Sequence, residues 1–260
     1  MGESLPLFEI AALSAGACLA GAMNAIAGGG TIVTFPLLIA LGMPAIQANA
    51  TSTVALMVGI FGSVYGYRQN LPAAKPWMKL FAPMSILGGL LGAWLLTVTS
   101  EKFFNDIVPF LILFATVLFL LGNVAGRIAG FDGNVNAVSP AKKFVAVLIQ
   151  FGVAIYGGYF GAGIGILMLA AFAFIGLKNI HEMNALKTIL GGLINLVAAV
   201  YFVQAGLVIW PVAFLMMLAS AVGYYGGAAL TQKIPQRLVR ILIAGIGLTL
   251  SAVFFWRQFA

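Results

Sequence analysis

The sequence predicts an all-α polytopic membrane protein built from two repeats of inverted topology, and three observations predict that fold class. The first is composition, because 62% of the 260 residues are hydrophobic and 7% are charged. Soluble domains average about 45–50% apolar and about 25% charged residues, and a soluble fold of this length has too little interior to bury the excess. The second observation is a series of long apolar segments, and the third is a pair of landmarks that recurs between the two halves of the chain.

Ten apolar segments form two sets of five, and each set has one short member in second place. Backbone groups in lipid must be satisfied within the segment, so helices are the expected structure. A span needs about 20 residues to cross a hydrocarbon core of about 30 Å, and the short members would reach only about 18–20 Å. Each half is therefore predicted to have four long spans and one short helix that is interrupted or re-entrant. The segments cover about 6–27, 31–42, 46–67, 77–98 and 103–126, and then about 144–161, 164–176, 183–204, 207–228 and 238–256.

Two landmarks recur in register between the halves. Ala27-Gly28-Gly29-Gly30 opens the first short segment, and Gly161-Ala162-Gly163-Ile164-Gly165 opens the second. Further along, the stretch around Asn49 matches the stretch around Asn184, and both landmarks keep an offset of 134 to 135 residues. The predicted organisation is a first transmembrane repeat (1–126), a cytoplasmic linker (127–143) and a second transmembrane repeat (144–260).

The charged loop residues predict the orientation. The net charge is +7, but the basic residues are spread over short loops and do not form the patch that nucleic-acid binding requires. Lysine and arginine favour cytoplasmic loops, which places 68–79, 127–143 and 229–240 inside and 99–106 and 204–208 outside. This arrangement requires that the long first span and its short partner either both cross the membrane or both turn back. Each half then crosses an odd number of times, so the two halves run in opposite directions, as in many secondary transporters.

The glycine clusters are candidate anion-binding elements. A glycine-rich break frees backbone N–H groups, and the helix that starts after it presents the positive end of its dipole. Paired breaks at repeat-related positions would meet near the pseudo-symmetry axis. The alternative is that these glycines only allow close helix packing. The candidates are Gly28, Gly29, Gly30, Gly161, Gly163 and Gly165, with Asn24 and Thr31 flanking the first cluster.

Lys187 is the strongest single candidate for a substrate-binding residue. It lies about eight residues, or roughly 12 Å, into its span, and an ammonium at that depth marks a substrate pathway with a partner. The alternative is that the side chain extends to the headgroups. Asn184 lies one turn before Lys187 and Asn195 lies two turns after it. Hydroxyls and amides of the matching stretch in the first half are candidate donors to an oxyanion, although Ser and Thr in spans also bond their own helix carbonyls. These candidates are Asn49, Thr51, Ser52 and Thr53.

The remaining titratable residues argue against other functions. All six carboxylates lie at or near segment ends, whereas a cation transporter or proton pump ordinarily needs an acid deep in the membrane. One histidine and one cysteine do not make a metal site, and no hydrolase or protease motif is present. We therefore expect no catalytic residue, no metal and no cofactor.

These motifs resemble the sulfite exporter TauE/SafE family, also called the toluene sulfonate uptake permease family. The matching stretches are 21–52 and 157–202, and with the span pattern the resemblance covers nearly the whole chain. It implies a multi-pass permease of the bacterial inner membrane for sulfur-containing anions, with the two glycine clusters, Asn184 and Lys187 lining the route. Tyr156, Tyr159 and Phe160 crowd the second cluster, where the sequence departs from the family pattern.

The sequence thus predicts a transporter for a small sulfur-containing anion, sulfite or an organosulfonate such as sulfoacetate, bound near the bilayer midplane at the repeat interface. The expected partners are this anion and the lipid bilayer of the cell inner (plasma) membrane, with no nucleic acid, and a homo-oligomer is left open. Two alternatives stay open at this point. One is an intramembrane enzyme acting on lipid or peptide, which would need a nucleophile and a base together in mid-span. The other is an accessory membrane subunit without a substrate.

Overall fold

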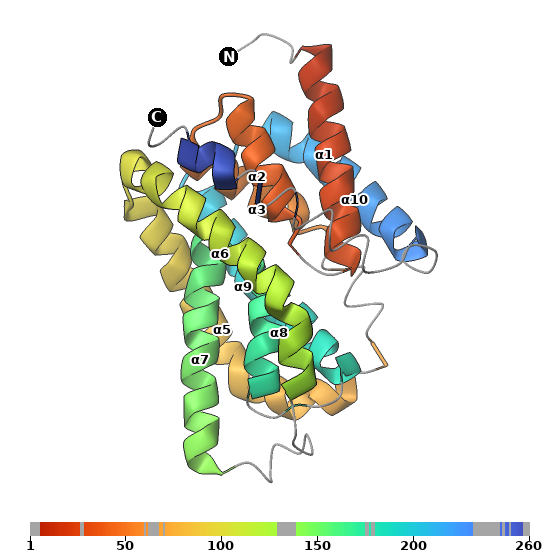
Figure 1. Ribbon diagram of the computed structural model, residues 1–260, viewed down its shortest axis with the longest axis vertical. Helices are drawn as coiled ribbons and strands as arrows, with labels where there is room; N and C mark the ends of the chain where they lie inside the picture. Colours follow the sequence, from red (N-terminus) through yellow and green to blue (C-terminus); the bar gives the residue numbers. More distant parts are fainter. Residues whose placement is uncertain are drawn as a thin grey trace.

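The protein is all-helical over the residues that its computed structural model describes, which are 6–26, 29–59, 61, 68–69, 71–128, 139–174, 177, 180–230, 245, 248–249 and 251–256. Figure 1 shows the helices packed as one bundle, with segments from both halves of the chain side by side. They are α1 (Leu7–Ile26), α2 (Thr31–Ala40), α3 (Ala45–Leu56), α5 (Leu71–Val98), α6 (Glu101–Ile128), α7 (Pro140–Tyr159), α8 (Ile164–Phe174), α9 (Ile180–Gln204) and α10 (Trp210–Leu230). The predicted all-α class is confirmed for this part of the chain.

Four of the described helices are long and apolar enough to cross a membrane. They contain the stretches Leu7–Asn24, Ala74–Val98, Pro140–Tyr159 and Glu182–Gln204. Large apolar side chains such as Trp94 and Leu148 are about half exposed on the outside of the bundle, which fits lipid as the surrounding solvent. The predicted segments 46–67 and 238–256 lie partly outside the described residues, so the expectation of eight long spans stays a prediction.

The two short segments form short helices, as predicted. α2 has 10 residues and α8 has 11, so neither reaches across about 30 Å of hydrocarbon. α2 turns back along α1, since the Gly30 N–H donates to Asn24 Oδ1 at 2.6 Å and Leu37 lies over Gly16. α8 packs against α7, the helix that precedes it, and against α9. Each short helix therefore lies inside the bundle beside the helix from which the chain has just come.

Glycines allow close helix crossings at two of the main packing contacts. α1 packs chiefly against α10, and α5 packs chiefly against α7 and α9. At the first crossing, a Cβ added at Gly21 or Gly223 would collide with the backbone of the other helix. At the α5–α7 crossing the same is true of Gly92 and Gly158. These four glycines bring helix backbones into contact, which is the usual role of small residues between membrane helices.

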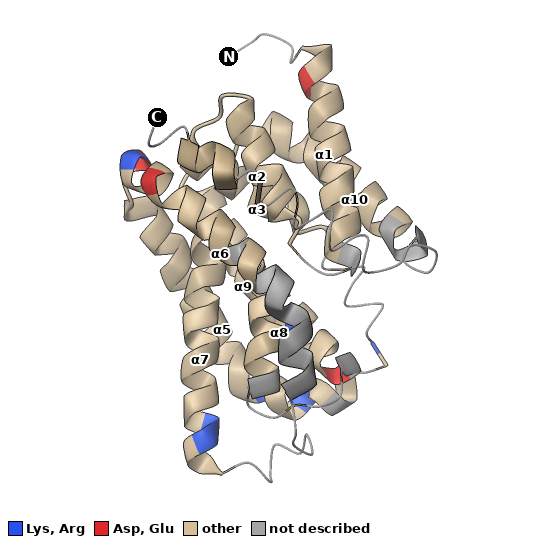
Figure 2. Cartoon of the chain, in the orientation of Figure 1, with Lys and Arg blue, Asp and Glu red and all other residues tan. Residues whose placement is uncertain are grey.

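The charged ends of the helices agree with the predicted sidedness. α5 and α7 run in the same direction, because Ser85 bonds to Gln150 and Gly92 lies against Ile155. Their first turns therefore share one end of the molecule, and the turn between α5 and α6 lies at the other. Figure 2 shows basic residues (blue) at the start of α7 at one end and residues of both signs (blue and red) at the start of α6 at the opposite end. Which end is cytoplasmic stays a prediction, and most of the loop 229–240 lies outside the described residues.

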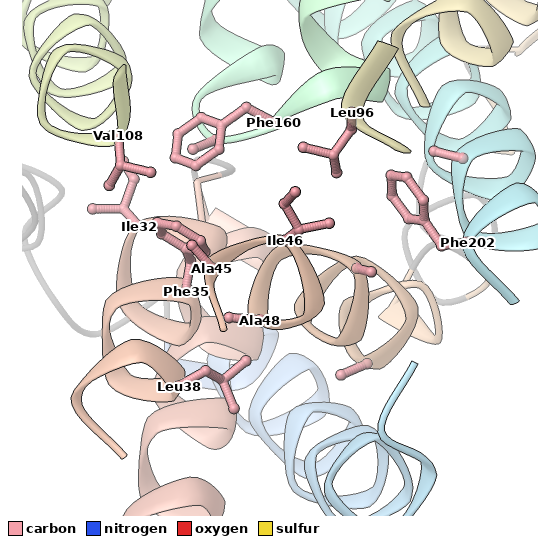
Figure 3. Packing of buried hydrophobic residues seen from close by; sticks show 14 of the residues in the cluster. Ile32, Phe35, Leu38, Ala45, Ile46, Ala48, Leu96, Val108, Phe160 and Phe202 are labelled. Carbon is pink, nitrogen blue, oxygen red and sulfur yellow. The ribbon is translucent and has the colours of Figure 1, made fainter. Parts of the chain in front are cut away.

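A buried aromatic cluster joins α2 to the turn that precedes α8. The rings of Phe35 and Phe160 meet edge to face with centroids 5.2 Å apart, and Phe104 of α6 packs on both. Figure 3 shows Phe160 above Ile32 and Phe35, with side chains of several helices around them. Phe35 and Phe104 are fully buried. The chain segments that lead into the second short helix therefore pack directly on the first.

Candidate functional site

The second glycine break lies between the end of α7 and the start of α8. The N–H groups of Phe160 and Gly161 both donate to Tyr156 O, at 2.9 and 3.2 Å, and so end the helix. Gly161 and Gly163 have φ values of +75° and +73°, a region that other L-residues rarely adopt. The Tyr156 hydroxyl donates to Ala162 O at 2.6 Å and holds the turn. The backbone of this break thus requires glycine at two of the positions predicted from the sequence.

Lys187 of α9 lies across the first turn of α8. A Cβ added at Gly165 would be 3.2 Å from Lys187 Cδ, so the lysine stem packs closely on Gly165. The ammonium donates to Asn184 Oδ1 at 3.0 Å, as the one-turn spacing predicts. Within the described part of the chain, this neutral amide is the hydrogen-bond partner of the ammonium. The structure therefore brings three predicted residues, Gly165, Asn184 and Lys187, into one place.

Positive potential is concentrated at this point. The N-terminus of a helix carries about half a positive elementary charge from its aligned peptide dipoles, and the Lys187 ammonium adds a full charge beside the first turn of α8. Two positive charges repel strongly where the surroundings have a low dielectric constant. An anion between the ammonium and the first N–H groups of α8 would relieve this repulsion, which is the chemistry of an anion-binding site.

Two asparagines also reach the second break, one from each half. Asn195 Oδ1 lies 3.8 Å from the position that a Cβ on Gly161 would take, so Asn195 faces the turn. Asn49 of α3 is 1% exposed and donates from Nδ2 to Tyr159 O, the last carbonyl of α7, at 3.0 Å. A residue of the first half thus contributes to the break of the second half, which its position in the sequence does not indicate.

The first break has the same backbone form and a different lining. Gly29 has a φ of +97° and stands 134 residues before Gly163, so the positive-φ positions of the two breaks are in register. α2 begins at Thr31, and Asn24 Oδ1 accepts the Gly30 N–H at 2.6 Å. Asn24 therefore occupies one of the N–H groups that an anion would use. Gly28, also predicted for this break, lies outside the described residues.

The hydroxyl cluster of α3 forms hydrogen bonds within the protein. The Ser52 hydroxyl and the Thr34 hydroxyl of α2 are 2.6 Å apart, and both side chains are fully buried. Thr51 Oγ1 accepts the Ile209 N–H at 3.1 Å, just before α10. Thr53 donates to the carbonyl four residues earlier in its own helix, at 2.9 Å, which is the alternative role for such residues. In this conformation the cluster ties α3 to its neighbours, and the partner Thr34 is a residue that the sequence analysis missed.

Glu101 is a second residue that the sequence analysis did not connect to the site. Its carboxylate accepts the N–H groups of Ala45 and Ile46 and so caps the start of α3. A carboxylate at a helix N-terminus also interacts favourably with the helix dipole. Ile46 and Glu101 are 55 residues apart, so no local pattern could have revealed the pair. By holding the first turn of α3, Glu101 orients Asn49 one turn later.

Comparison with known proteins points to one family. The family model described as sulfite exporter TauE/SafE matches residues 13–254. The probable membrane transporter protein YfcA of Escherichia coli (strain K12) is 28% identical over 238 residues, which cover 91% of this chain and 86% of the relative. A probable membrane transporter protein of Haemophilus influenzae is 28% identical over 249 residues, 92% of each chain. The probable membrane transporter protein ORF9 of a Sinorhizobium species is 26% identical over 255 residues, 96% of this chain and 93% of the relative.

Proposed function

The chain belongs to the sulfite exporter TauE/SafE family, and from that premise we propose that it carries a small sulfur-containing anion, sulfite or an organosulfonate such as sulfoacetate, across the cell inner membrane. Membership in the family makes the protein a multi-pass membrane transporter, and it confirms the resemblance seen in the sequence. It also sets aside the alternative of an intramembrane enzyme, since the relatives are named as transporters.

One observation carries the choice of an anion. The Lys187 stem lies on Gly165 in the first turn of α8, and the ammonium is bonded to a neutral amide. An unneutralised ammonium inside a span is costly and marks a functional site by default. Here a helix N-terminus beside it adds potential of the same sign. A cationic substrate would be repelled from this point, whereas an oxyanion would be bound by the ammonium and by backbone N–H groups together.

The surroundings of the second break favour a small anion. The side chains of Tyr156 and Phe160 lie against the turn. Ala162 and Phe160 are almost completely buried. Asn184 and Asn195 supply amide groups on the same helix as Lys187. Sulfite and short organosulfonates present three oxygens at one end, which several donors arranged around one turn of backbone would satisfy. The charged group of the substrate is the part that this site would recognise.

The pattern of helix packing supports two structurally related halves, and we propose that they are the inverted repeats. Exchange of the two halves relates α1 to α7 and α10 to α5, and both α1–α10 and α7–α5 are principal packing pairs. The breaks before α2 and α8 carry their positive-φ glycines, Gly29 and Gly163, at matching positions. In such repeats the substrate binds at the interface of the halves, near the membrane midplane. We place the anion there, on the side of the interface that Lys187 lines.

Binding to the purified protein in detergent tests the proposed function. A ligand that binds the native state stabilises it by RT ln(1 + [L]/Kd), or about 2.7 kcal/mol at a hundredfold excess over Kd. Sulfite, sulfate, sulfoacetate and isethionate would be compared with chloride at equal ionic strength. We expect a saturable rise in melting temperature with sulfite or a sulfonate, and flux of the same anion in proteoliposomes. No rise and no flux with any of the four would refute the proposal.

A further inference from the structure

Asn49 has a buried carbonyl oxygen for which the described residues provide no donor. Its Nδ2 donates to Tyr159 O, and because that carbonyl can only accept, the orientation of the amide is fixed. Oδ1 accepts no hydrogen bond within the described part of the chain, and the residue is 1% exposed. Leaving a buried polar atom unpaired costs about 1–3 kcal/mol. The atom is therefore expected to have a ligand.

In the second half, the side-chain oxygen of the matching asparagine accepts a hydrogen bond from a positively charged group. Asn184 stands 135 residues after Asn49, and its Oδ1 accepts a hydrogen bond from the ammonium of Lys187, three residues further along the same helix. In α3 the residue three positions after Asn49 is Ser52, and its hydroxyl is bonded to Thr34. The first half thus has the same carbonyl oxygen without the ammonium group that binds it in the second half.

We propose that Asn49 Oδ1 binds an alkali cation, Na⁺ or K⁺, at the end of α7, where the cation takes the role that the Lys187 ammonium has in the second half. Carbonyl oxygens are the ligands that alkali cations use in membrane proteins. The last carbonyls of α7 present the negative end of a helix dipole to the same place. Tyr159 O retains a second lone pair after accepting from Asn49, and Gly157 O faces the break, 3.1 Å from the position of a Cβ on Gly161.

A cation at this position would couple to the anion. An amide does not take up a proton near neutral pH, so a metal ion and not a proton is the expected ligand of Asn49. With a doubly charged anion such as sulfite or sulfoacetate at Lys187, a cation at Asn49 would bring the loaded transporter to neutrality and reduce the cost of exposing charge to the bilayer. The coupling rests on the proposed anion transport, whereas the binding of the cation does not depend on it.

The melting temperature of the purified protein without a sulfur anion tests cation binding by itself. We expect NaCl or KCl to raise the melting temperature saturably above its value in choline chloride of equal concentration. Asn49→Leu removes the oxygen and should abolish this rise. Gln150→Leu is the matched control, because Gln150 is equally buried and also has a side-chain oxygen without a donor among the described residues, but lies in the middle of α7. The control should keep the full rise.

A second variant keeps the test decisive if Asn49→Leu does not fold. Asn49→Asp has the same shape with a negative charge and should strengthen alkali-cation binding at least tenfold. Equal melting in all three chlorides, or a full rise in Asn49→Leu, would overturn the proposal and leave Oδ1 to an ordered water. Lys187→Ala separates this inference from the proposed function, since it should lose the sulfite-dependent rise and keep the alkali-dependent one. An alkali-dependent rise without any anion-dependent rise in the wild type would support the cation site and reject anion binding.

Discussion

The two glycine breaks share a backbone and differ in the chemistry of their linings. Gly29 and Gly163 both have positive φ, and each precedes a short helix. At the first break an amide, Asn24, caps the new helix. At the second break a lysine lies across the new helix instead. The difference shows that the repeated glycines specify where the helices are interrupted, whereas residues of neighbouring helices decide what each interruption can bind.

Both breaks have contacts from both halves of the chain. At the first break, Asn24 accepts the Gly30 N–H and also forms a side-chain hydrogen bond with Tyr224 of α10. The second break is held by Tyr156 of its own half and by Asn49 of the other. A rearrangement of one half against the other would therefore disturb both breaks, as expected in a transporter that works by relative motion of its repeats.

Lys187→Ala should have the largest effect on binding. Hydrogen bonds to charged groups contribute about 1.5–3 kcal/mol, so sulfite affinity should fall roughly 10- to 150-fold. The substrate-free protein should melt at or above the wild-type temperature, because the change removes a charge that opposes the dipole of α8. Lys102→Ala, on the exposed first turn of α6, is the control and should bind normally. Titration calorimetry measures the sulfite affinity of both variants. Wild-type affinity in Lys187→Ala would show that the charge of Lys187 is not what distinguishes the second break from the first.

Gly163→Ala and Gly29→Ala sharpen the comparison at matching positions. A positive φ costs a non-glycine residue about 1–2 kcal/mol, so both variants should melt a few degrees earlier. Among the described residues, the Cβ added at Gly29 meets Ile32 Cδ1 alone, at an ordinary 3.5 Å, so the cost there is assigned to the backbone. We expect the sulfite-dependent rise in melting temperature to be nearly lost in Gly163→Ala and only reduced in Gly29→Ala. Equal losses in the two variants would mean that both breaks bind the anion to the same extent.

Asn24→Ala should have the smallest effect. Loss of a helix cap costs about 1 kcal/mol, and the Gly30 N–H would then be free for water or an anion. The melting temperature should fall slightly while sulfite affinity stays within about twofold of the wild type, as measured by calorimetry. A loss of affinity as large as that of Lys187→Ala would show that Asn24 contacts the anion and that the first break is part of the same site.

The helices themselves follow from the sequence. Long apolar runs without charge leave helices as the way to satisfy the backbone in lipid, and the short predicted segments 31–42 and 164–176 correspond to α2 and α8 within two residues at each end. The bond between Asn184 and Lys187 also follows from local spacing, because residues three apart on a helix are neighbours.

The contacts between distant segments do not follow from the sequence. Glu101 bonds to the start of α3, and Asn49 bonds to the end of α7, across 55 and 110 residues. Such pairs depend on how the helices pack, and apolar periodicity carries no information about them. For the same reason, Asn24 and Ser52 look from the sequence like donors to a ligand, whereas the structure gives each a partner within the protein.

A structure with a bound heavy analogue of sulfite would test the charged second break most directly. Selenite has the charge and pyramidal shape of sulfite, and anomalous diffraction locates its selenium atom without ambiguity. We predict one selenium peak, in hydrogen-bonding contact with Lys187 Nζ and with N–H groups in the first turn of α8. A peak at Gly29–Gly30 instead, or one without contact to Lys187, would contradict the account.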